Sequence, residues 1–201
     1  MHPTKLFHTH DPEHLCALME AHPFCLITSV LSGRPVAAHT PVLVNPADDE
    51  PPTLRFHLAN ANPVTQALKI GAPGLIIATG PHAYISPDWY GLGPDQVPTW
   101  NYLSAEAEGE PGLLSPAETK KFLADLSEFF EADLAPKQPW ALEKMSRDKL
   151  DMLMSGITAF RLIPDRFEGV VKLNQNKPKS ARETVADQLE DAALARWMRD
   201  I

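Results

Sequence analysis

The sequence predicts a mainly β protein in which a small antiparallel barrel carries added helices. Several short segments alternate apolar and polar residues with the two-residue period of a half-buried strand, most clearly residues 53–60. Strands and helices do not alternate regularly, and no glycine-rich turn joins a strand to a helix. A doubly wound parallel sheet is therefore disfavoured, and an antiparallel barrel is preferred.

The N-terminal quarter predicts a helix followed by a β-hairpin. Asp11 can cap a helix that has Pro12 at its first position and ends near residue 22. The apolar run at 24–31 and the segment 36–43 flank a turn of sequence SGRP. We therefore expect these two segments to pair as antiparallel strands.

The next strand, at residues 53–60, has two different faces. One face is apolar (Leu54, Phe56 and Leu58) and the other is polar (Arg55 and His57). A short helix is expected at 62–69 and a strand at 74–79, which Gly80 and Pro81 would end. Residues 80–100 would then form a long loop before a strand at 99–108.

Three helices and two strands are expected after residue 110. Ser115 and Glu118 form the pattern of a capping box for a helix reaching residue 133, whose apolar side holds Phe122, Leu126 and Phe129. A second helix is expected at 139–155. Two further strands are expected at 157–163 and 167–173, joined by a Pro164-Asp165 turn. A capping box at Ser180 and Glu183 would then begin the C-terminal helix, which ends near residue 199.

Composition indicates one globular domain, residues 1–201, with helical additions at about 116–155 and 181–199. Its 44% hydrophobic and 22% charged residues are ordinary for such a protein. No apolar run is long enough to span a membrane, and the N-terminus lacks the apolar core of a signal peptide, so we expect a cytoplasmic protein. Cys16 and Cys25 form no metal-like pair and are interpreted as buried, reduced thiols.

The charge distribution argues against a protein built to hold nucleic acid. The net charge is −8, whereas nucleic-acid affinity depends on neutralising phosphates with Lys and Arg. Residues 172–182 are an exception, because they contain four basic residues and no acidic one. This patch suits one small anion better than a duplex, so DNA binding by the chain alone is doubtful.

Two segments carry the chemistry of a ligand site. GPHAYISPDWY (80–90) and VPTWNY (97–102) concentrate aromatic rings, hydroxyls and an amide, which suits a flat heteroaromatic ligand. Packing within a proline-rich loop is the alternative interpretation. KLNQNKP (172–178) places amides between two lysines, a mixture that suits phosphate and sugar hydroxyls. Its alternative is a solvated strand end.

Metal binding and nucleophilic catalysis are not predicted. All eight histidines lie within the first 82 residues, and His8, His10 and His14 lie close together. Asp11-Pro12 places a helix start between His10 and His14, and no second ligand cluster follows, so surface histidines are preferred over a metal site. The sequence holds no GxSxG motif, and we assign no catalytic residue.

Along nearly its whole length the chain resembles the PaiB-like family of FMN-binding negative transcriptional regulators. The segments that carry the resemblance are PTKLF (3–7) with Asp11-Pro12, AHTP (38–41), HLANANP (57–63), and the segments 80–90, 97–102 and 172–178 described above. The resemblance implies a split β-barrel like that of flavin reductases and pyridoxamine-phosphate oxidase. It also implies a homodimer with FMN at the subunit interface.

The resemblance also implies which residues contact the flavin. Those expected near the phosphate are Lys172, Gln175 and Asn176, and those expected near the ribityl chain or ring are Trp100, Asn101 and Tyr102. His39 and His57 are weaker candidates.

The function implied is that of a negative transcriptional regulator or a flavin or redox sensor. The alternative is a flavin-dependent oxidoreductase that uses reduced nicotinamide and an unidentified acceptor. Haem binding or degradation on the same kind of barrel is a third hypothesis.

Overall fold

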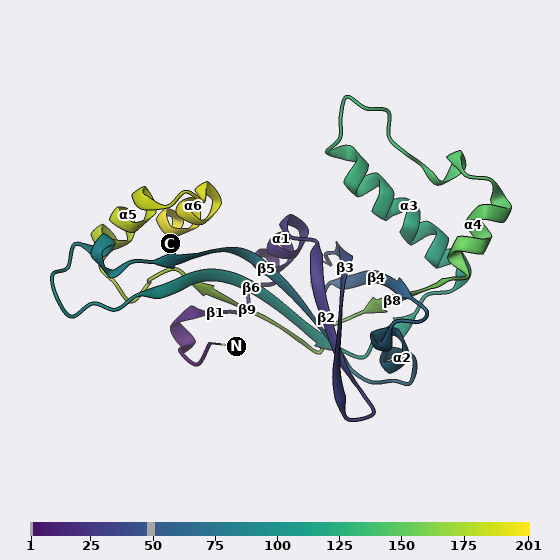
Figure 1. Ribbon diagram of the computed structural model, residues 1–201, viewed down its shortest axis with the longest axis horizontal. Helices are drawn as coiled ribbons and strands as arrows, with labels where there is room; N and C mark the ends of the chain where they lie inside the picture. The colour runs from purple at the N-terminus through teal and green to yellow at the C-terminus, as the bar shows by residue number, and fades with distance from the viewer. Residues whose placement is uncertain (1, 48–50) are drawn as a thin grey trace. The chain divides into compact units, whose positions relative to one another are not determined.

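The structure is a computed structural model that describes residues 2–47 and 51–201 (Figure 1). Its described residues form two compact units. The first unit comprises Met1–His22, Ile77–Ala107 and Phe167–Ile201, and the second comprises Pro23–Ile76 and Glu108–Arg166. Strands β5 (Gly74–Ile85) and β6 (Thr99–Gly109) begin or end in the second unit and run into the first.

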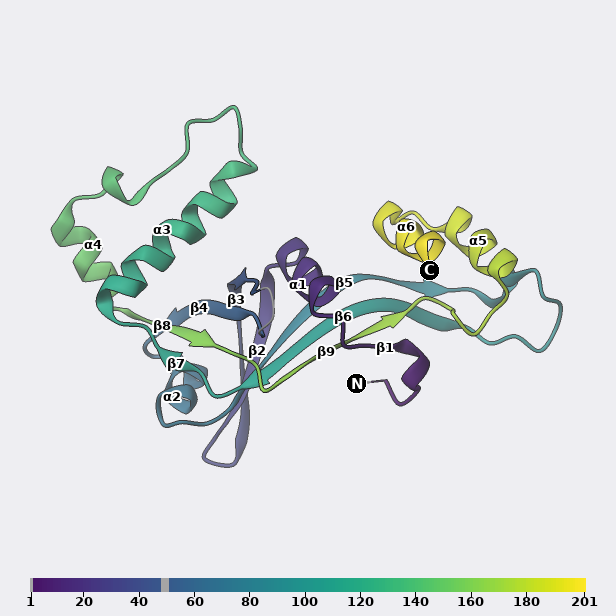
Figure 2. The ribbon, with the colours of Figure 1, turned by 180° about the vertical axis from the view of Figure 1, so that it is seen from behind.

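The first unit is a sheet with helices on one side. Its strands follow the order β1-β9-β6-β5, and β1 pairs antiparallel with β9. Helices α5 and α6 lie on one side of β5 and β6, and the short helix η1 lies on the other (Figures 1 and 2). The remaining bounds are η1 (Lys5–Phe7), β1 (His8–Thr9), α1 (Pro12–Ala21), η2 (Pro87–Tyr90), β9 (Arg166–Lys172), α5 (Lys179–Gln188) and α6 (Ala192–Asp200).

The second unit is an antiparallel sheet with helices on both faces. Its strands follow the order β2-β3-β4-β8-β7, and each neighbouring pair is antiparallel. The bounds are β2 (Phe24–Leu31), β3 (Arg34–Asn45), β4 (Thr53–Ala59), α2 (Pro63–Lys69), β7 (Gly112–Leu113), α3 (Pro116–Ala132), η3 (Leu142–Lys144), α4 (Arg147–Met154) and β8 (Ile157–Leu162).

The two faces of β4 are buried differently, as the alternation predicts. The apolar face lies in the core, where the Phe56 and Phe160 rings stack with centroids 5.3 Å apart. On the other face, Phe122 of α3 packs with Leu43 and Ala159, and the Arg55 guanidinium lies 5.6 Å from the Phe122 ring. Helix α3 therefore covers the polar face of β4.

Most expected elements are confirmed. The Asp11 carboxylate accepts N–H bonds from Glu13 and His14 at the start of α1. At the start of α3, the Ser115 hydroxyl accepts from the Glu118 N–H while the Glu118 carboxylate accepts from the Ser115 N–H. The hairpin of β2 and β3 turns where Leu31 pairs with Arg34. Local side-chain chemistry was thus sufficient to place these boundaries.

The expected end of a strand at Gly80-Pro81 is wrong. Strand β5 continues through both residues to Ile85, so the loop expected at 80–100 is shorter than predicted. A Cβ at position 80 would lie 2.7 Å from Leu18 Cδ1 and 3.1 Å from Leu103 Cβ. Gly80 therefore allows close packing within the strand and does not end it.

Two helix predictions need correction. The helix expected at 139–155 is the short helix η3 followed by α4. The helix expected after Ser180 is divided into α5 and α6. The capping box expected at Ser180 is also wrong, because α5 begins at Lys179 and its N-cap, Pro178, makes no side-chain hydrogen bond. The Asp191 carboxylate instead caps α6.

One packing expectation also differs from the structure. Phe122 and Leu126 are buried in a cluster with Leu43 and Ala159, but Phe129 lies outside this cluster and keeps 39% of its surface exposed. Strands β8 and β9 are consecutive in the chain but have different neighbours, since β8 lies between β4 and β7 while β9 lies between β1 and β6.

The cysteines and the helices agree with the remaining expectations. Cys16 and Cys25 form no disulfide and are buried, and burial raises the pKa of Cys25 to about 12. None of the helices in the described ranges is long and apolar enough to cross a membrane.

Candidate functional site

Lys172 ends β9 beside the first residues of β6. Its ammonium group donates to the Thr99 hydroxyl at 2.5 Å and to the Trp100 carbonyl oxygen. The side chain is half-buried, and burial lowers the pKa of Lys172. A lysine ammonium has three N–H donors, so one donor remains for an anion.

An exposed aromatic face lies on β5 and β6 next to this lysine. It consists of His82, Tyr84, Trp100 and Tyr102. The Trp100 ring lies 6.3 Å from that of His82 and 6.2 Å from that of Tyr84, and 55% of Trp100 is exposed. Tyr102 shares this side of β6 because it lies two residues further along the strand. The aromatic face offers a flat apolar surface on which a ring can stack.

Asn101 lies on the opposite side of β6. It is fully buried, and its amide nitrogen donates to the Met198 sulfur of α6 at 3.3 Å. Its side-chain oxygen has no partner among the described residues. The two-residue period of the strand thus separates Asn101 from Trp100 and Tyr102, with which it was grouped in the sequence.

The turn after β9 uses its amides in different ways. The Gln175 side chain folds back on the strand, accepting from the Leu173 N–H and donating to the Val171 carbonyl oxygen. Asn176 is exposed. Gln175 therefore supports the turn, whereas Asn176 is open to solvent.

Asn174 is a residue that the sequence interpretation did not select. It is 3% exposed, has a φ of 62°, and its side-chain nitrogen lacks a partner among the described residues. Burial raises the pKa of the nearby Tyr90, and the Asn174 side chain opposes this rise by a smaller amount. Asparagine tolerates the left-handed conformation well, and this is the signal that could have identified the turn.

Lys177 completes this part of the first unit. Its ammonium group donates to the Gln96 side-chain oxygen at 2.6 Å and lies 4.9 Å from the centre of the Tyr90 ring. This end of the sheet is therefore rich in hydrogen-bond donors. They are the ammonium groups of Lys172 and Lys177 and the unpartnered side-chain nitrogen of Asn174, which lies between them in sequence.

His39 and His57 belong to the second unit. His39 is exposed and stacks on Phe24 with ring centroids 5.7 Å apart. His57 faces α3, with its ring edge-on to Phe122 at 5.8 Å, and its Nδ1 atom is buried without a partner among the described residues. Burial lowers the pKa of His57.

Within residues 2–47 and 51–201, no group of three or more His, Cys, Asp or Glu side chains could hold a metal ion.

Residues 1–166 match the family model described as "Putative FMN-binding domain". The chain belongs to this FMN-binding family. Its cofactor is FMN, as the sequence predicts. The match ends before Lys172, so it supports the cofactor without assigning the residues of the turn after β9.

Relatives of this FMN-binding protein support the PaiB-like resemblance. The chain is 28% identical over 191 residues to "Protease synthase and sporulation protein PAI 2" of Bacillus subtilis, covering 95% of this chain and 90% of that protein. It is 26% identical to the uncharacterized protein AN0679 of Emericella nidulans, covering 69% and 66% of the two chains.

Solved structures confirm the fold class of the FMN-binding protein. The FAD and haem binding protein of Mycobacterium smegmatis has a TM-score of 0.62 at 18% identity, covering 90% of this chain and 80% of that one. The flavocytochrome Anf3 of Azotobacter vinelandii has a TM-score of 0.60 at 14% identity, covering 86% and 72%. At these identities the likeness shows the split-barrel fold alone.

The residues of the first unit fit FMN. The cofactor combines a flat ring with a phosphate dianion, and it therefore needs an exposed aromatic surface close to a cation. Trp100 and Lys172 provide both, and the backbone carbonyl of Trp100 holds the Lys172 ammonium group beside the aromatic face.

Proposed function

We propose that this FMN-binding protein is a homodimeric regulator or flavin sensor, in which FMN occupancy or redox state changes what the dimer binds. The observation that carries the proposal is the exposed aromatic face beside the partly desolvated ammonium group of Lys172. The name of the Bacillus subtilis relative refers to protease synthase and sporulation, and this favours a regulatory role over a metabolic one.

In this proposal each residue of the first unit has a separate task. Lys172 pairs with the phosphate, Asn176 donates to it from the exposed turn, and Trp100 and Tyr102 contact the ring or ribityl chain. Gln175 holds the turn, and Asn101 fixes β6 against α6. His39 and His57 remain weaker candidates. Bound FMN would supply the redox chemistry, while the protein supplies binding and orientation.

The homodimer follows from the exposure of large apolar side chains. Trp100 and Tyr84 of the aromatic face are about half exposed, and a second copy of the chain could cover both the face and the flavin. Light scattering at micromolar concentration tests this. A mass of one chain with FMN still bound would contradict it.

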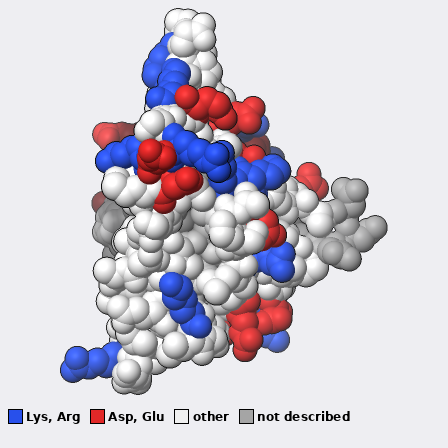
Figure 3. Space-filling model, turned by 90° about the vertical axis from the view of Figure 1, so that its right-hand side faces the viewer, with Lys and Arg blue, Asp and Glu red and all other residues white. Residues whose placement is uncertain are grey.

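Regulation is proposed to be indirect. A dimer would carry twice the chain's net charge of −8, which repels DNA. On the face shown in Figure 3, Lys and Arg side chains alternate with Asp and Glu and form no broad basic surface. Anisotropy titration with promoter DNA and competitor is the test, and nanomolar sequence-selective binding by the protein alone would overturn this part of the proposal.

We propose that residues 1–201 form one domain that acts in the cytoplasm, where buried thiols such as Cys16 and Cys25 stay reduced. A single calorimetric transition would support one domain.

The deciding experiment begins with the visible spectrum of the freshly purified protein, followed by titration with FMN and with riboflavin. We expect a flavin spectrum and tighter binding of FMN. Equal affinity for both ligands would remove the phosphate site, and a haem spectrum would favour the haem hypothesis. Rapid oxidation of reduced nicotinamide would favour the oxidoreductase, whereas slow turnover with tightly bound FMN supports a sensor.

A further inference from the structure

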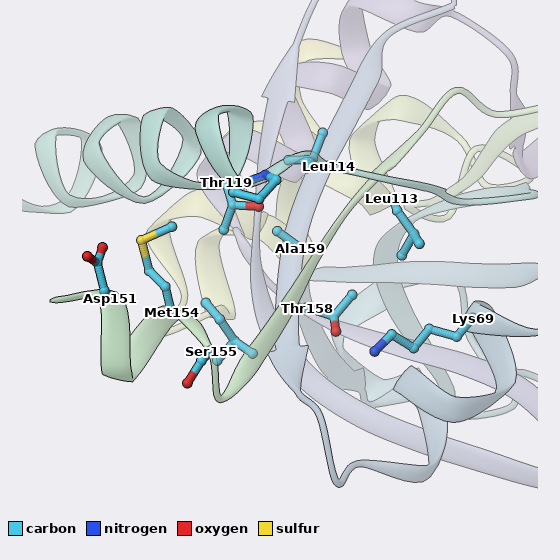
Figure 4. Close-up of a pocket in the computed structure, with 11 residues that line it drawn as sticks. Lys69, Leu113, Leu114, Thr119, Asp151, Met154, Ser155, Thr158 and Ala159 are labelled. Carbon is cyan, nitrogen blue, oxygen red and sulfur yellow. The ribbon is translucent and has the colours of Figure 1, made fainter. Parts of the chain in front are cut away.

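The second unit contains a cavity of about 420 Å³ that the flavin proposal does not use (Figure 4). It lies between the end of α2, the segment from β7 into α3, the end of α4 and the start of β8. This volume lies within the roughly 300–1,000 Å³ typical of small-molecule sites. The flavin candidates Lys172 and Trp100 belong to the first unit.

Much of the cavity wall is apolar. The apolar side chains come from β7, α3, α4, β8 and the connection after β7, namely Leu113, Leu114, Pro116, Met154, Ile157 and Ala159. Ala159 is almost fully buried and its small side chain leaves space between α3 and β8. An apolar chain of a ligand would be removed from water against this wall.

Two polar groups of the cavity are available to a ligand. Lys69, the last residue of α2, is exposed and extends toward Thr158 in Figure 4, and none of the described residues forms an ion pair with it. Thr119 is only 7% exposed, and its hydroxyl makes no hydrogen bond to any described residue. A solvated cation and a nearly buried hydroxyl, neither with a side-chain partner among the described residues, therefore line an apolar wall.

The other polar groups are already engaged. The Thr158 hydroxyl donates to the Asn60 side-chain oxygen at 2.6 Å, and the Ser155 hydroxyl donates to the Met152 carbonyl oxygen at 2.7 Å. Asp151 lies at the end of the cavity away from Lys69 (Figure 4) and is 3.9 Å from the Arg147 guanidinium. Asp151 therefore does not neutralise Lys69.

We propose that this cavity binds a small carboxylic acid with an apolar chain. The carboxylate pairs with the Lys69 ammonium group at the edge of the cavity, while the chain lies against Leu114, Met154 and Ile157. A charged group paired at the edge and an apolar chain inside match the distribution of polar and apolar groups along the wall. This inference is independent of the proposed flavin function.

The test uses the full-length, flavin-loaded protein and hexanoate, with 1-hexanol and hexylamine as ligands of equal chain length. We expect saturable binding of hexanoate by calorimetry and a shift of the Met154 methyl signal in ¹³C-methyl-methionine spectra, assigned with Met154→Leu. 1-Hexanol should bind at least about tenfold more weakly, and hexylamine more weakly still, because neither provides an anion for Lys69.

Two variants and a matched control locate the site. Lys69→Met keeps most of the side-chain volume and should weaken hexanoate about tenfold without changing 1-hexanol. Thr119 lies on the side of the cavity away from Lys69, so Thr119→Val should leave the ratio of the two affinities unchanged. Lys149→Met removes an exposed charge from α4 outside the cavity and should change nothing. Absence of saturable binding, equal affinity for hexanoate and 1-hexanol, or equal effects of Lys69→Met and Lys149→Met would overturn the proposal. Unchanged flavin absorbance in every variant separates this result from a failure of flavin binding.

Discussion

The Lys172 ammonium group lies 2.5 Å from the Thr99 hydroxyl oxygen, joining the end of β9 to the start of β6. Thr99 is 73 positions away in the sequence, so the contact depends on the pairing of the two strands. The Thr99 hydroxyl and the Trp100 carbonyl together orient the lysine and leave one N–H free.

Replacing Lys172 by Ala should weaken FMN about tenfold or more and riboflavin much less. The reason is that a cation facing a phosphate forms a charge-assisted hydrogen bond, which riboflavin cannot form. Fluorescence titration with both flavins measures the difference. Asn176→Ala should cost less, and the exposed Lys179→Ala serves as the control for loss of one positive charge. Unchanged FMN affinity in Lys172→Ala would show that the phosphate binds elsewhere.

Trp100 should report flavin binding through its fluorescence. A flavin stacked on the aromatic face would quench the Trp100 indole, so Trp100→Phe should lose most of the FMN-induced quenching while retaining part of the affinity. Trp197→Phe is the matched control, because Trp197 lies on α6 and contacts His14 of α1. If the two variants lose equal quenching, the flavin does not stack on Trp100.

Stability should fall as the pH decreases below about 6.5 because of His57. Burial lowers the pKa of His57 below its ordinary value of 6.5, so the unfolded chain takes up a proton that the folded chain does not. The contribution of His57 to the free energy of unfolding is therefore fully present above pH 6.5. It decreases as the pH falls from 6.5 toward the lower pKa of His57 in the folded chain.

Urea unfolding at several pH values checks this dependence. His57→Leu should make the free energy of unfolding less dependent on pH. His10→Leu is the control, because it removes a histidine at an exposed position. A slope that is the same in His57→Leu and in the unmodified protein would contradict the assignment.

Gly169→Ala should destabilise the first unit by about 1–3 kcal/mol. A Cβ at this position would collide with the Ser104 carbonyl oxygen and lie 2.5 Å from Leu15 Cδ2, which would force β9 away from β6 or α1. Thermal unfolding measures the loss. Gly112→Ala is the comparison, because a Cβ there would approach no atom closer than 3.5 Å. Equal melting temperatures of the two variants would refute the close packing at Gly169.

Much of the fold could be predicted because its signals are local. Asp11, Ser115 and Glu118 satisfy backbone N–H groups within a few residues of themselves, so the starts of α1 and α3 follow from short-range chemistry. The alternation in β4 likewise separates the buried Phe56 from His57 on the face under α3.

Other boundaries depended on distant neighbours. Gly80 predicts the end of a strand from residue type alone, but β5 continues through it. Position 80 is a glycine because Leu18 and Leu103 occupy the space that a Cβ would fill. The division of the C-terminal helix also involves packing, since Met198 of α6 contacts the buried Asn101 of β6.

The sequence by itself determined the family and the cofactor, because motifs such as GPHAYISPDWY and VPTWNY retain their chemistry without coordinates. Only the tertiary structure decided which side chains of those motifs are available. Strand pleating exposes Trp100 and buries Asn101, and the Lys172 contact with Thr99 joins segments far apart in the chain. Exposure and long-range contacts are properties of packed elements, so they cannot be obtained from local sequence chemistry.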